Sequence, residues 1–375
     1  MNNRPNYETL RDETKFSWHV GATVSALLEV TGIPIKEFNL NSDVGIELYR
    51  KGRPMLREMF GEDVNTVGLS TPPVSYGHIN CLGAELIFPD GGEVNHTKPF
   101  HTLEEGVESL KEKIDLDFAT AGMTPFYLDY RKKMSEAFGE PCGFWFGSEG
   151  PITTAYTLRG NDVFYDPYDN PELFKEFLRL LTDSIVQFFH FKEKLDGRPP
   201  VNPDGGGMCD DISAMFSPEM WPEFVLPLFD RYYCGITTGT RSAHIEDLRP
   251  NHLPYLEEMG LVNFDPSVSP RINPKIIRDR CRVPFGWRIS DFPYRAMDCQ
   301  DLSDFVFQAV ADGASYVFTH AAAAMCNPET VKKVHAFIAA AKESARMLDE
   351  GASREEIGEC VSAEGKKKFW DHWPE

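Results

Sequence analysis

The feature that most constrains the fold is an alternation of short apolar runs with amphipathic segments along the second half of the chain. Apolar runs lie at residues 142–151, 199–211, 241–246, 261–267, 283–290 and 314–321. Helical spacing of apolar residues appears between and after them, at 170–195, 217–233, 248–260, 273–281, 301–313 and 327–348. Such alternation is typical of parallel strands joined by crossover helices. In 375 residues without a glycine-rich nucleotide motif after a strand, it favours a (β/α)8 TIM barrel over a doubly wound sheet.

Two features add to this α/β barrel. Residues 1–65 show helical apolar spacing in "GATVSALLEVTG" and "DVGIELYRKGRPMLREMFG", which predicts a helical N-terminal extension. "AELIFPDGGEVNHT" has apolar runs on both sides of the turn signal "PDGG", which predicts a β-hairpin insertion. Within the helix expected at 217–233, Pro222 and Pro227 should break or kink the helix.

Composition excludes several classes of function. The net charge of −20 opposes binding to nucleic acid, whose partners carry basic stripes. No apolar run is long enough to span a membrane, and the polar start has no signal-peptide core, so we expect a cytoplasmic protein. The eight cysteines are scattered without a CxxC pair and do not indicate a disulfide framework. The oligomeric state stays open, a homodimer included.

Polar residues gather where the predicted strands end, which is where the active sites of such barrels lie. These residues are Glu149, Cys209, Asp210, Asp211, His244, Glu246, Asp265, Arg288, Asp291 and His320. In "RSAHIEDL", residues 241–248, His244 and Glu246 stand two apart and would project to one face of a strand. Cys326 follows the last strand and precedes a helix start, where a thiol pKa is lowered.

Imidazole, carboxylate and thiolate are the ligand types of zinc, so we predict a metal site on His244, Glu246 and Cys326. The alternative is a hydrogen-bonded pair without metal beside a buried cysteine. Candidates for substrate binding are the aromatic residues Phe144, Phe146 and Trp287, as an apolar wall for a flat substrate, together with Asp211 and His320. Each also has a structural alternative: barrel core for the rings, a loop-capping role for the aspartates and a strand-end hydrogen bond for the histidine.

Four segments occur in an order that resembles the uroporphyrinogen decarboxylase superfamily, and more narrowly its corrinoid-dependent methyltransferase branch. They are "GPITTAYTLRG" (150–160), "CDDISAMFSPEMWPEFVLPLFDRYY" (209–233), "HIEDLRPNHLPYLEEMG" (244–260) and "GASYVFTHAAAAMCNPETVKKVHAFI" (313–338). The resemblance covers roughly residues 115–345 and implies one barrel domain over 1–375. The arginine-rich signature of the decarboxylase itself has no counterpart in "WHVGATVSALLEV".

The resemblance implies zinc held by a His-x-Cys pair and a later cysteine, and this sequence has His244-x-Glu246 and Cys326 instead. Because a carboxylate makes the ligand set harder, we expect an oxygen substrate such as a methoxylated aromatic compound. The methyl group would pass to the Co(I) corrinoid (cobalamin) of a carrier protein. We expect this carrier to be a separate chain because no Asp-x-His-x-x-Gly signature is present. Asp210 or Asp265 would act in catalysis, as a fourth ligand or by giving a proton to the departing phenolate.

Three alternatives remain open on the sequence. The enzyme would methylate a thiol such as coenzyme M from a methylcorrinoid, or it would be a metal-free decarboxylase-like lyase. A third reading is a barrel that binds without catalysis. The exact methyl donor, the native metal and the fourth ligand do not follow from the residues.

Overall fold

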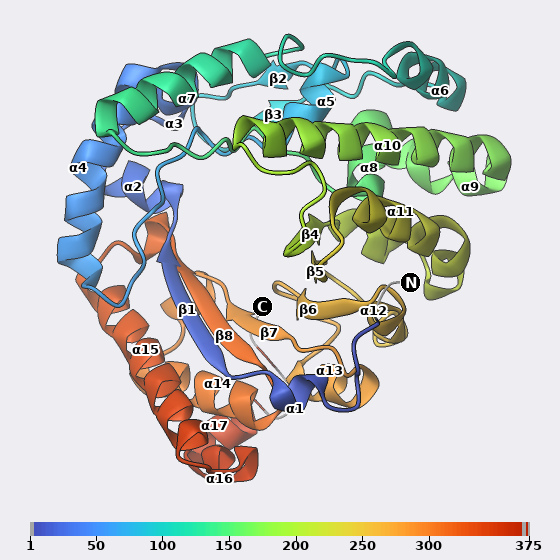
Figure 1. Ribbon diagram of the computed structural model, residues 1–375. Helices are drawn as coiled ribbons and strands as arrows, with labels where there is room; N and C mark the ends of the chain where they lie inside the picture. The colour runs from blue at the N-terminus through green and yellow to red at the C-terminus, as the bar shows by residue number, and fades with distance from the viewer. Residues whose placement is uncertain (1–3, 370–372, 374–375) are drawn as a thin grey trace.

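The computed structural model describes residues 4–369 and Trp373. It is a mixed α/β structure with two three-stranded parallel sheets near the centre and helices outside them (Figure 1). The first sheet has the order β1-β8-β7 and consists of β1 (Ser17–Ala22), β8 (Tyr316–Ala321) and β7 (Gly286–Ile289). The second has the order β4-β5-β6 and consists of β4 (Gly205–Cys209), β5 (Thr240–His244) and β6 (Leu261–Asp265). The predicted α/β class with parallel strands is confirmed.

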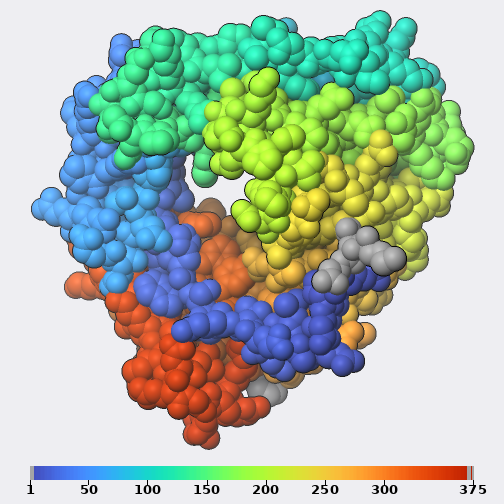
Figure 2. Space-filling model, in the orientation of Figure 1, coloured from blue at the N-terminus to red at the C-terminus, as the bar shows by residue number. Residues whose placement is uncertain are grey.

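Single parallel bridges continue the pairing beyond these sheets. Phe264 in β6 is bridged to Phe285, just before β7. Gly21 in β1 is bridged to Asn65, and the extended segments 70–74 and 143–146 are bridged to each other at two positions. The backbone N–H of Gly150 then donates to the carbonyl of Cys209 at the end of β4 (2.6 Å). The strands thus follow one another around the middle of the molecule, where Figure 2 shows an opening between the blue, green and orange segments.

Helices cover the strands on the outside (Figure 1). Their bounds are α1 (Leu10–Glu13), α2 (Val24–Thr31), α3 (Ile35–Leu40), α4 (Ser42–Phe60), α5 (Gly77–Cys81), α6 (Leu103–Glu112), α7 (Thr124–Phe138), α8 (Pro151–Arg159), α9 (Asp166–Asp169), α10 (Pro171–Leu195), α11 (Leu226–Ile236), α12 (Pro254–Glu258), α13 (Pro274–Arg280), α14 (Cys299–Ala311), α15 (Pro328–Asp349), α16 (Arg354–Glu359) and α17 (Ala363–Lys368). Three of them, α10, α13 and α15, begin with an Asn-Pro pair. In each the asparagine side chain accepts a backbone N–H of the first turn, and the proline takes a position whose N–H needs no partner. No helix among the described residues is long and apolar enough to cross a membrane.

The helix expected at 217–233 is interrupted as its prolines indicate. A 3-10 turn at Pro218–Met220 leads into a π-helical turn at Trp221–Val225, and regular α11 starts only at Leu226. The reason is that Pro222 and Pro227 lack the N–H that an uninterrupted helix needs.

The N-terminal segment departs from the prediction in one respect. Residues 1–65 contain α2, α3 and α4 as expected, but they also contain β1, which pairs along its whole length with β8 near the other end of the chain. Long-range pairing of this kind leaves no trace in local periodicity. The hairpin prediction is confirmed, because β2 (Leu86–Ile87) pairs antiparallel with β3 (Asn95–His96). Of the predicted domain 1–375, residues 1–3, 370–372 and 374–375 lie outside the described residues.

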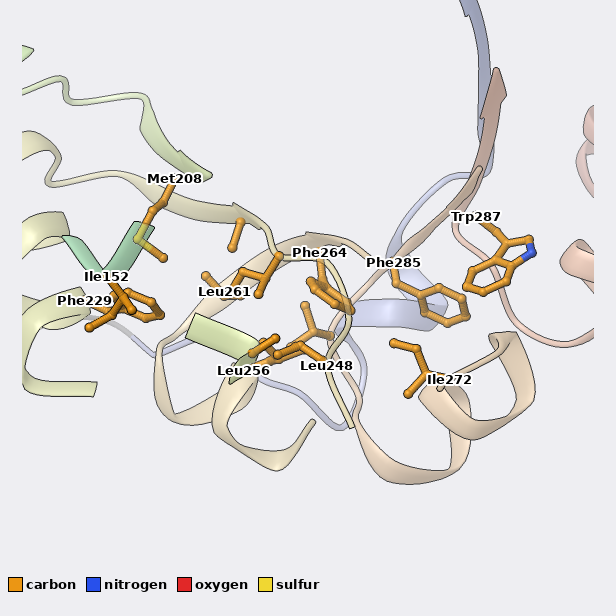
Figure 3. Close-up of a cluster of buried hydrophobic side chains, with 14 of the residues drawn as sticks. Ile152, Met208, Phe229, Leu248, Leu256, Leu261, Phe264, Ile272, Phe285 and Trp287 are labelled. Atoms are coloured by element: carbon orange, nitrogen blue, oxygen red, sulfur yellow. The ribbon is translucent and has the colours of Figure 1, made fainter. Parts of the chain in front are cut away.

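The main hydrophobic core lies between the strands and the surrounding helices. Figure 3 shows part of it, with Met208, Leu261 and Phe264 from the strands meeting side chains of α8, α11 and α12. A second, smaller core lies between α5, α7 and α10 and includes Phe118, Phe146 and Phe188. The fully buried His78 sits against this second core. Its ring lies beside the rings of Phe118 and Phe188, and its Nε2 lies 2.9 Å from Ser184 Oγ.

We expect His78 to make the protein sensitive to acid. Burial lowers its pKa from 6.5 to about 3, so between these values the unfolded chain binds a proton that the folded chain does not. Stability present above pH 6.5 is therefore lost as the pH falls, at up to about 1.4 kcal/mol per pH unit from this group. His78→Gln, which does not titrate, should flatten the pH dependence of the free energy of unfolding between pH 6.5 and 4, measured by urea denaturation. The exposed His335→Gln is the control, and equal slopes in both variants would contradict the assignment.

Candidate functional site

The register of β4, β5 and β6 brings three polar residues together at the carboxyl ends of these strands. Cys209, His244 and Asp265 are the last residues of the three strands, and they are paired in register, Cys209 with His244 and His244 with Asp265. Neighbouring parallel strands lie about 4.8 Å apart, so side chains at one register level that point to the same face are adjacent. The loops after β4 and β5 add Asp211 and Glu246 to this group.

His244 is held in one orientation by Asp265. Its Nδ1 lies 2.7 Å from Asp265 Oδ2, while its Nε2 lies 3.6 Å from both Asp211 Oδ1 and Glu246 Oε1. The first distance is a hydrogen bond and the other two are longer than one. A carboxylate on one ring nitrogen that leaves the other nitrogen facing further donors is the usual surrounding of a metal-binding histidine.

Cys209 and Asp211 complete the set of donors. Cys209 Sγ lies 3.8 Å from Asp211 Oδ2, and Asp211 Oδ1 accepts the backbone N–H of Glu246 (3.1 Å). Ligand atoms of Cys209, Asp211 and His244 all lie within 4.8 Å of one another, and among the described residues no other trio of histidine, cysteine or acidic side chains meets this limit. Glu149 adds a largely buried carboxyl group in contact with Cys209 and Ser75. We call Cys209, Asp211, His244 and Glu246 the donor cluster.

The spacing of the donor cluster fits a tetrahedral metal ion. Zinc–ligand bonds of about 2.0–2.3 Å place the ligand atoms of a tetrahedron roughly 3.3–3.8 Å apart. The distances of 3.6 Å from His244 Nε2 to the two carboxylates and of 3.8 Å from Cys209 Sγ to Asp211 lie in this range. Imidazole, carboxylate and thiolate are also the donor types that zinc accepts. The residues present therefore fit the metal that the sequence predicts.

The site has an excess of negative charge. Burial alone would lower the pKa of His244, but the hydrogen bond with Asp265 and the nearby Glu246 and Asp211 carboxylates raise it to about 10. The pKa of Asp265 is lowered despite burial, because His244 and the backbone N–H of Ser267 bond to its carboxylate. Burial and the neighbouring Glu149 and Asp211 carboxylates raise the pKa of the Cys209 thiol. Three carboxylates around one imidazole favour a bound cation.

Ser267 links the donor cluster to β7. Its hydroxyl donates to Glu246 Oε1 and accepts from Arg288 Nη2, and its backbone N–H donates to Asp265 Oδ1 (2.8 Å). Ser267 has a φ of +54°, and Asp247 beside Glu246 has +57°, in the left-handed region that few residues other than glycine adopt. Strained backbone of this kind clusters at functional sites. Here it turns a fully buried hydroxyl towards Glu246.

Of the predicted metal ligands, the structure brings His244 and Glu246 together and places Cys326 elsewhere. Cys326 Sγ lies 4.0 Å from the carbonyl of Ala26 on α2 and 3.7 Å from that of Ala322. Burial raises the pKa of the Cys326 thiol to about 11, so the lowering expected from the following helix does not prevail. In this structure the thiol beside His244 is that of Cys209.

The two predicted catalytic aspartates have separate positions. Asp265 orients His244. Asp210 is fully buried and faces the start of α8, where its carboxylate accepts the backbone N–H groups of Ile152 and Thr153 (both 2.9 Å) and the hydroxyl of Thr153. Because adjacent residues point in opposite directions, Asp211 faces the cluster and Asp210 anchors α8 to β4. Asp210 thus caps the start of α8, which is the kind of structural role that the sequence leaves open for the aspartates.

The predicted aromatic wall lies in the core. Phe144 and Phe146 are buried in the second core, where Phe146 stacks on Tyr127 with ring centroids 4.9 Å apart. Trp287 is 2% exposed and packs in the main core (Figure 3). His320 is partly buried on β8, with its ring centroid 6.3 Å from that of His19 and 5.5 Å from that of Phe318. None of these four side chains lies in the donor cluster.

The site also contains Glu149, Cys209 and Arg288. The sequence places these residues at strand ends, but nothing in it distinguishes them as site residues from the other polar residues there. Ser267 carries no signal in the sequence, because its role depends on a backbone angle. Cys209 lies beside His244 because β4 pairs with β5, and the sequence does not show which strands are neighbours.

No family model and no curated protein matches the sequence. Solved structures do match, among them a methyltransferase from Methanosarcina mazei, with a TM-score of 0.62 and 18% sequence identity. The match covers 90% of this chain and 97% of that one. At this identity the similarity concerns the fold.

We expect glycine to be better tolerated than alanine at position 267. Both substitutions remove the hydroxyl that joins Glu246 to Arg288, but only Ser267→Gly relieves the positive φ. The free energy of unfolding should therefore be about 1 kcal/mol higher for Ser267→Gly than for Ser267→Ala. Within a helix or strand the order is reversed, because glycine there lowers stability by about 0.5–1 kcal/mol relative to alanine. Chemical denaturation of the two variants measures this difference. A more stable alanine variant would refute the strained conformation.

We expect Asp210→Ala to reduce stability without removing a bound metal. The substitution leaves the N–H groups of Ile152 and Thr153 buried without an acceptor, at a cost of roughly 2–5 kcal/mol. Asp210→Asn keeps one acceptor and should lose less. Thermal unfolding gives the stability, and elemental analysis of the folded protein gives the metal content. Loss of metal at unchanged stability would instead place Asp210 in the donor cluster.

Proposed function

We propose that this protein is a zinc-dependent methyltransferase that demethylates a small methoxylated aromatic compound, with the corrinoid of a separate carrier protein as methyl acceptor. The observation that carries the proposal is the donor cluster, with tetrahedral spacing at the carboxyl ends of parallel strands. The fold similarity to a methyltransferase and the sequence resemblance to a corrinoid-dependent branch support the same reaction class.

We also infer that the two sheets and the bridged segments belong to one (β/α)8 barrel. The order of pairing supports this inference, because it runs from β1 through residues 65–74 and 143–147 to β4, and from β6 through Phe285 to β7 and β8. In such barrels the active site lies at the carboxyl ends of the strands, where the donor cluster is.

In this proposal His244, Asp211 and Cys209 would hold the metal, and Glu246 is available as a further carboxylate. A zinc ion bound there would supply Lewis-acid chemistry that polarises an ether oxygen. Asp265 keeps the His244 ring in place, and Ser267 does the same for Glu246. Since Asp265 is bonded to His244 and Asp210 to α8, neither carboxylate is free to give a proton to the departing phenolate.

Demethylation of an oxygen compound is preferred to thiol methylation because of the donor types. At least one carboxylate stands with one thiol around His244, and oxygen donors make a harder, more strongly polarising metal than a thiolate-rich set. Activation of a thiol would gain from more thiolates. The reverse reaction, from a methylcorrinoid to a thiol such as coenzyme M, is therefore the second choice.

One observation favours a metal-free lyase instead. With a pKa of about 10, His244 is an imidazolium at neutral pH when no metal is present, and it can itself neutralise the carboxylates around it. Metal content separates this candidate from the methyltransferase.

The first experiment is elemental analysis of the purified protein after incubation with zinc and removal of excess metal. We expect about one zinc per chain in the wild type, loss of zinc in His244→Ala and Cys209→Ser, and retention in the exposed control Cys360→Ser. Retention in Cys326→Ser is also expected. If Cys326→Ser loses zinc and Cys209→Ser keeps it, the ligand set predicted from the sequence is the right one.

The second experiment tests the reaction. The zinc-loaded protein is mixed with cob(I)alamin and methoxyarenes in one assay, and with methylcobalamin and thiols in another. Formation of a phenol in the first assay, abolished by His244→Ala, is the expected result. Product in the second assay alone would reverse the direction of transfer, and release of carbon dioxide from an acidic compound without corrinoid would favour the lyase.

A further inference from the structure

A pocket beside the donor cluster contains a cation without a counter-ion. The pocket has a volume of about 400 Å³ and lies between the last turns of α10 and the extended segments 73–75 and 144–148. Phe189, Lys192 and Glu193 line it from α10, and Asp196 lines it from the C-cap position just after this helix. They recur at three- and four-residue spacing, so they share one helix face. Its size falls in the range of about 300–1,000 Å³ that small-molecule sites occupy.

The acidic residues of this pocket already have partners. Glu193 accepts two hydrogen bonds from Arg198, at 2.7 and 2.9 Å, and Asp196 is paired with both Arg131 and Arg198. The side chain of Lys192 forms no hydrogen bond and no salt bridge with any residue that the structure describes, although the Asp196 and Glu193 carboxylates lie near enough to act on its charge. These two carboxylates and three cations leave one positive charge in excess. Burial lowers the pKa of Lys192 more than the nearby Asp196 and Glu193 carboxylates raise it, as expected for an ammonium group without a direct ion pair.

Aromatic rings line the pocket from both sides, Phe189 from α10 and Phe144 and Trp145 from the extended segment. Phe144 and Phe189 line it with buried or partly buried rings, and the side chain of Trp145 is 59% exposed. The exposed ring of Trp145 offers a flat apolar surface at the pocket. A flat apolar body can lie against Trp145 while an anionic group on the same molecule reaches Lys192.

We propose that this pocket binds an aromatic carboxylate, with the carboxylate at Lys192 Nζ and the ring against Trp145. The pocket adjoins the donor cluster, because Ser75 lines it and also bonds to Glu149, which contacts Cys209. The proposal concerns binding alone. It therefore stands or falls independently of the proposed methyl transfer.

The experiment is a calorimetric titration of the full-length protein with benzoate and, separately, with its neutral counterpart benzyl alcohol. We expect saturable binding of benzoate that weakens about tenfold or more in Lys192→Gln and is restored in Lys192→Arg, as for a charge-assisted contact. Benzyl alcohol should bind wild type and Lys192→Gln alike. Lys194→Gln, exposed on another face of α10, is the matched control and should behave as wild type.

A second readout places the ring of the ligand. Benzoate should quench tryptophan fluorescence in the wild type, and Trp145→Phe should remove this quenching while keeping most of the affinity. Absence of saturable binding, or equal affinity of wild type and Lys192→Gln, would overturn the proposal. Circular dichroism checks that each variant is folded. If Lys192→Gln does not fold, Lys192→Met takes its place.

Discussion

The candidate site depends on the register of three parallel strands. Because β4, β5 and β6 end at the same level, Cys209, His244 and Asp265 stand side by side without any loop having to carry them there. The loops contribute only the adjustable part, Asp211 and Glu246. A slip of one residue by any of these strands would turn its strand-end side chain to the opposite face, so the chemistry of the site and the packing of the core are fixed together.

Concentrating carboxylates in one place has an energetic cost that the surroundings offset. Asp265 is held by His244 and by the N–H of Ser267, and Glu246 by the Ser267 hydroxyl with Arg288 behind it. Each charge thus has a donor before any metal arrives. This arrangement requires a left-handed backbone at Ser267, a conformation that costs stability in a residue other than glycine.

The strands and helices from β4 onward could be predicted because their signals are local: apolar spacing, Asn-Pro starts and prolines that interrupt a helix. His244 and Glu246 could be paired for the same reason. The choice between Cys209 and Cys326 could not, since it depends on which strands are neighbours. Period-two spacing likewise shows that Phe144 and Phe146 share a face, but not that this face is the core. Closure of the strands into an eight-stranded barrel cannot be predicted from local signals, because it depends on pairing between distant segments.

The pairing of β1 with β8 has a consequence for how the chain folds as it is made. Along one edge β1 meets only a single bridge at Asn65, while along the other it pairs over its whole length with residues 316–321. At roughly 5–20 residues per second, about 15–60 s pass on the ribosome between the synthesis of these two strands. During that time one full edge of β1 has open backbone groups, which is the state in which strands from different chains associate. The nascent protein thus needs its first strand to be shielded, by its own helices or by a chaperone, until its last strand emerges.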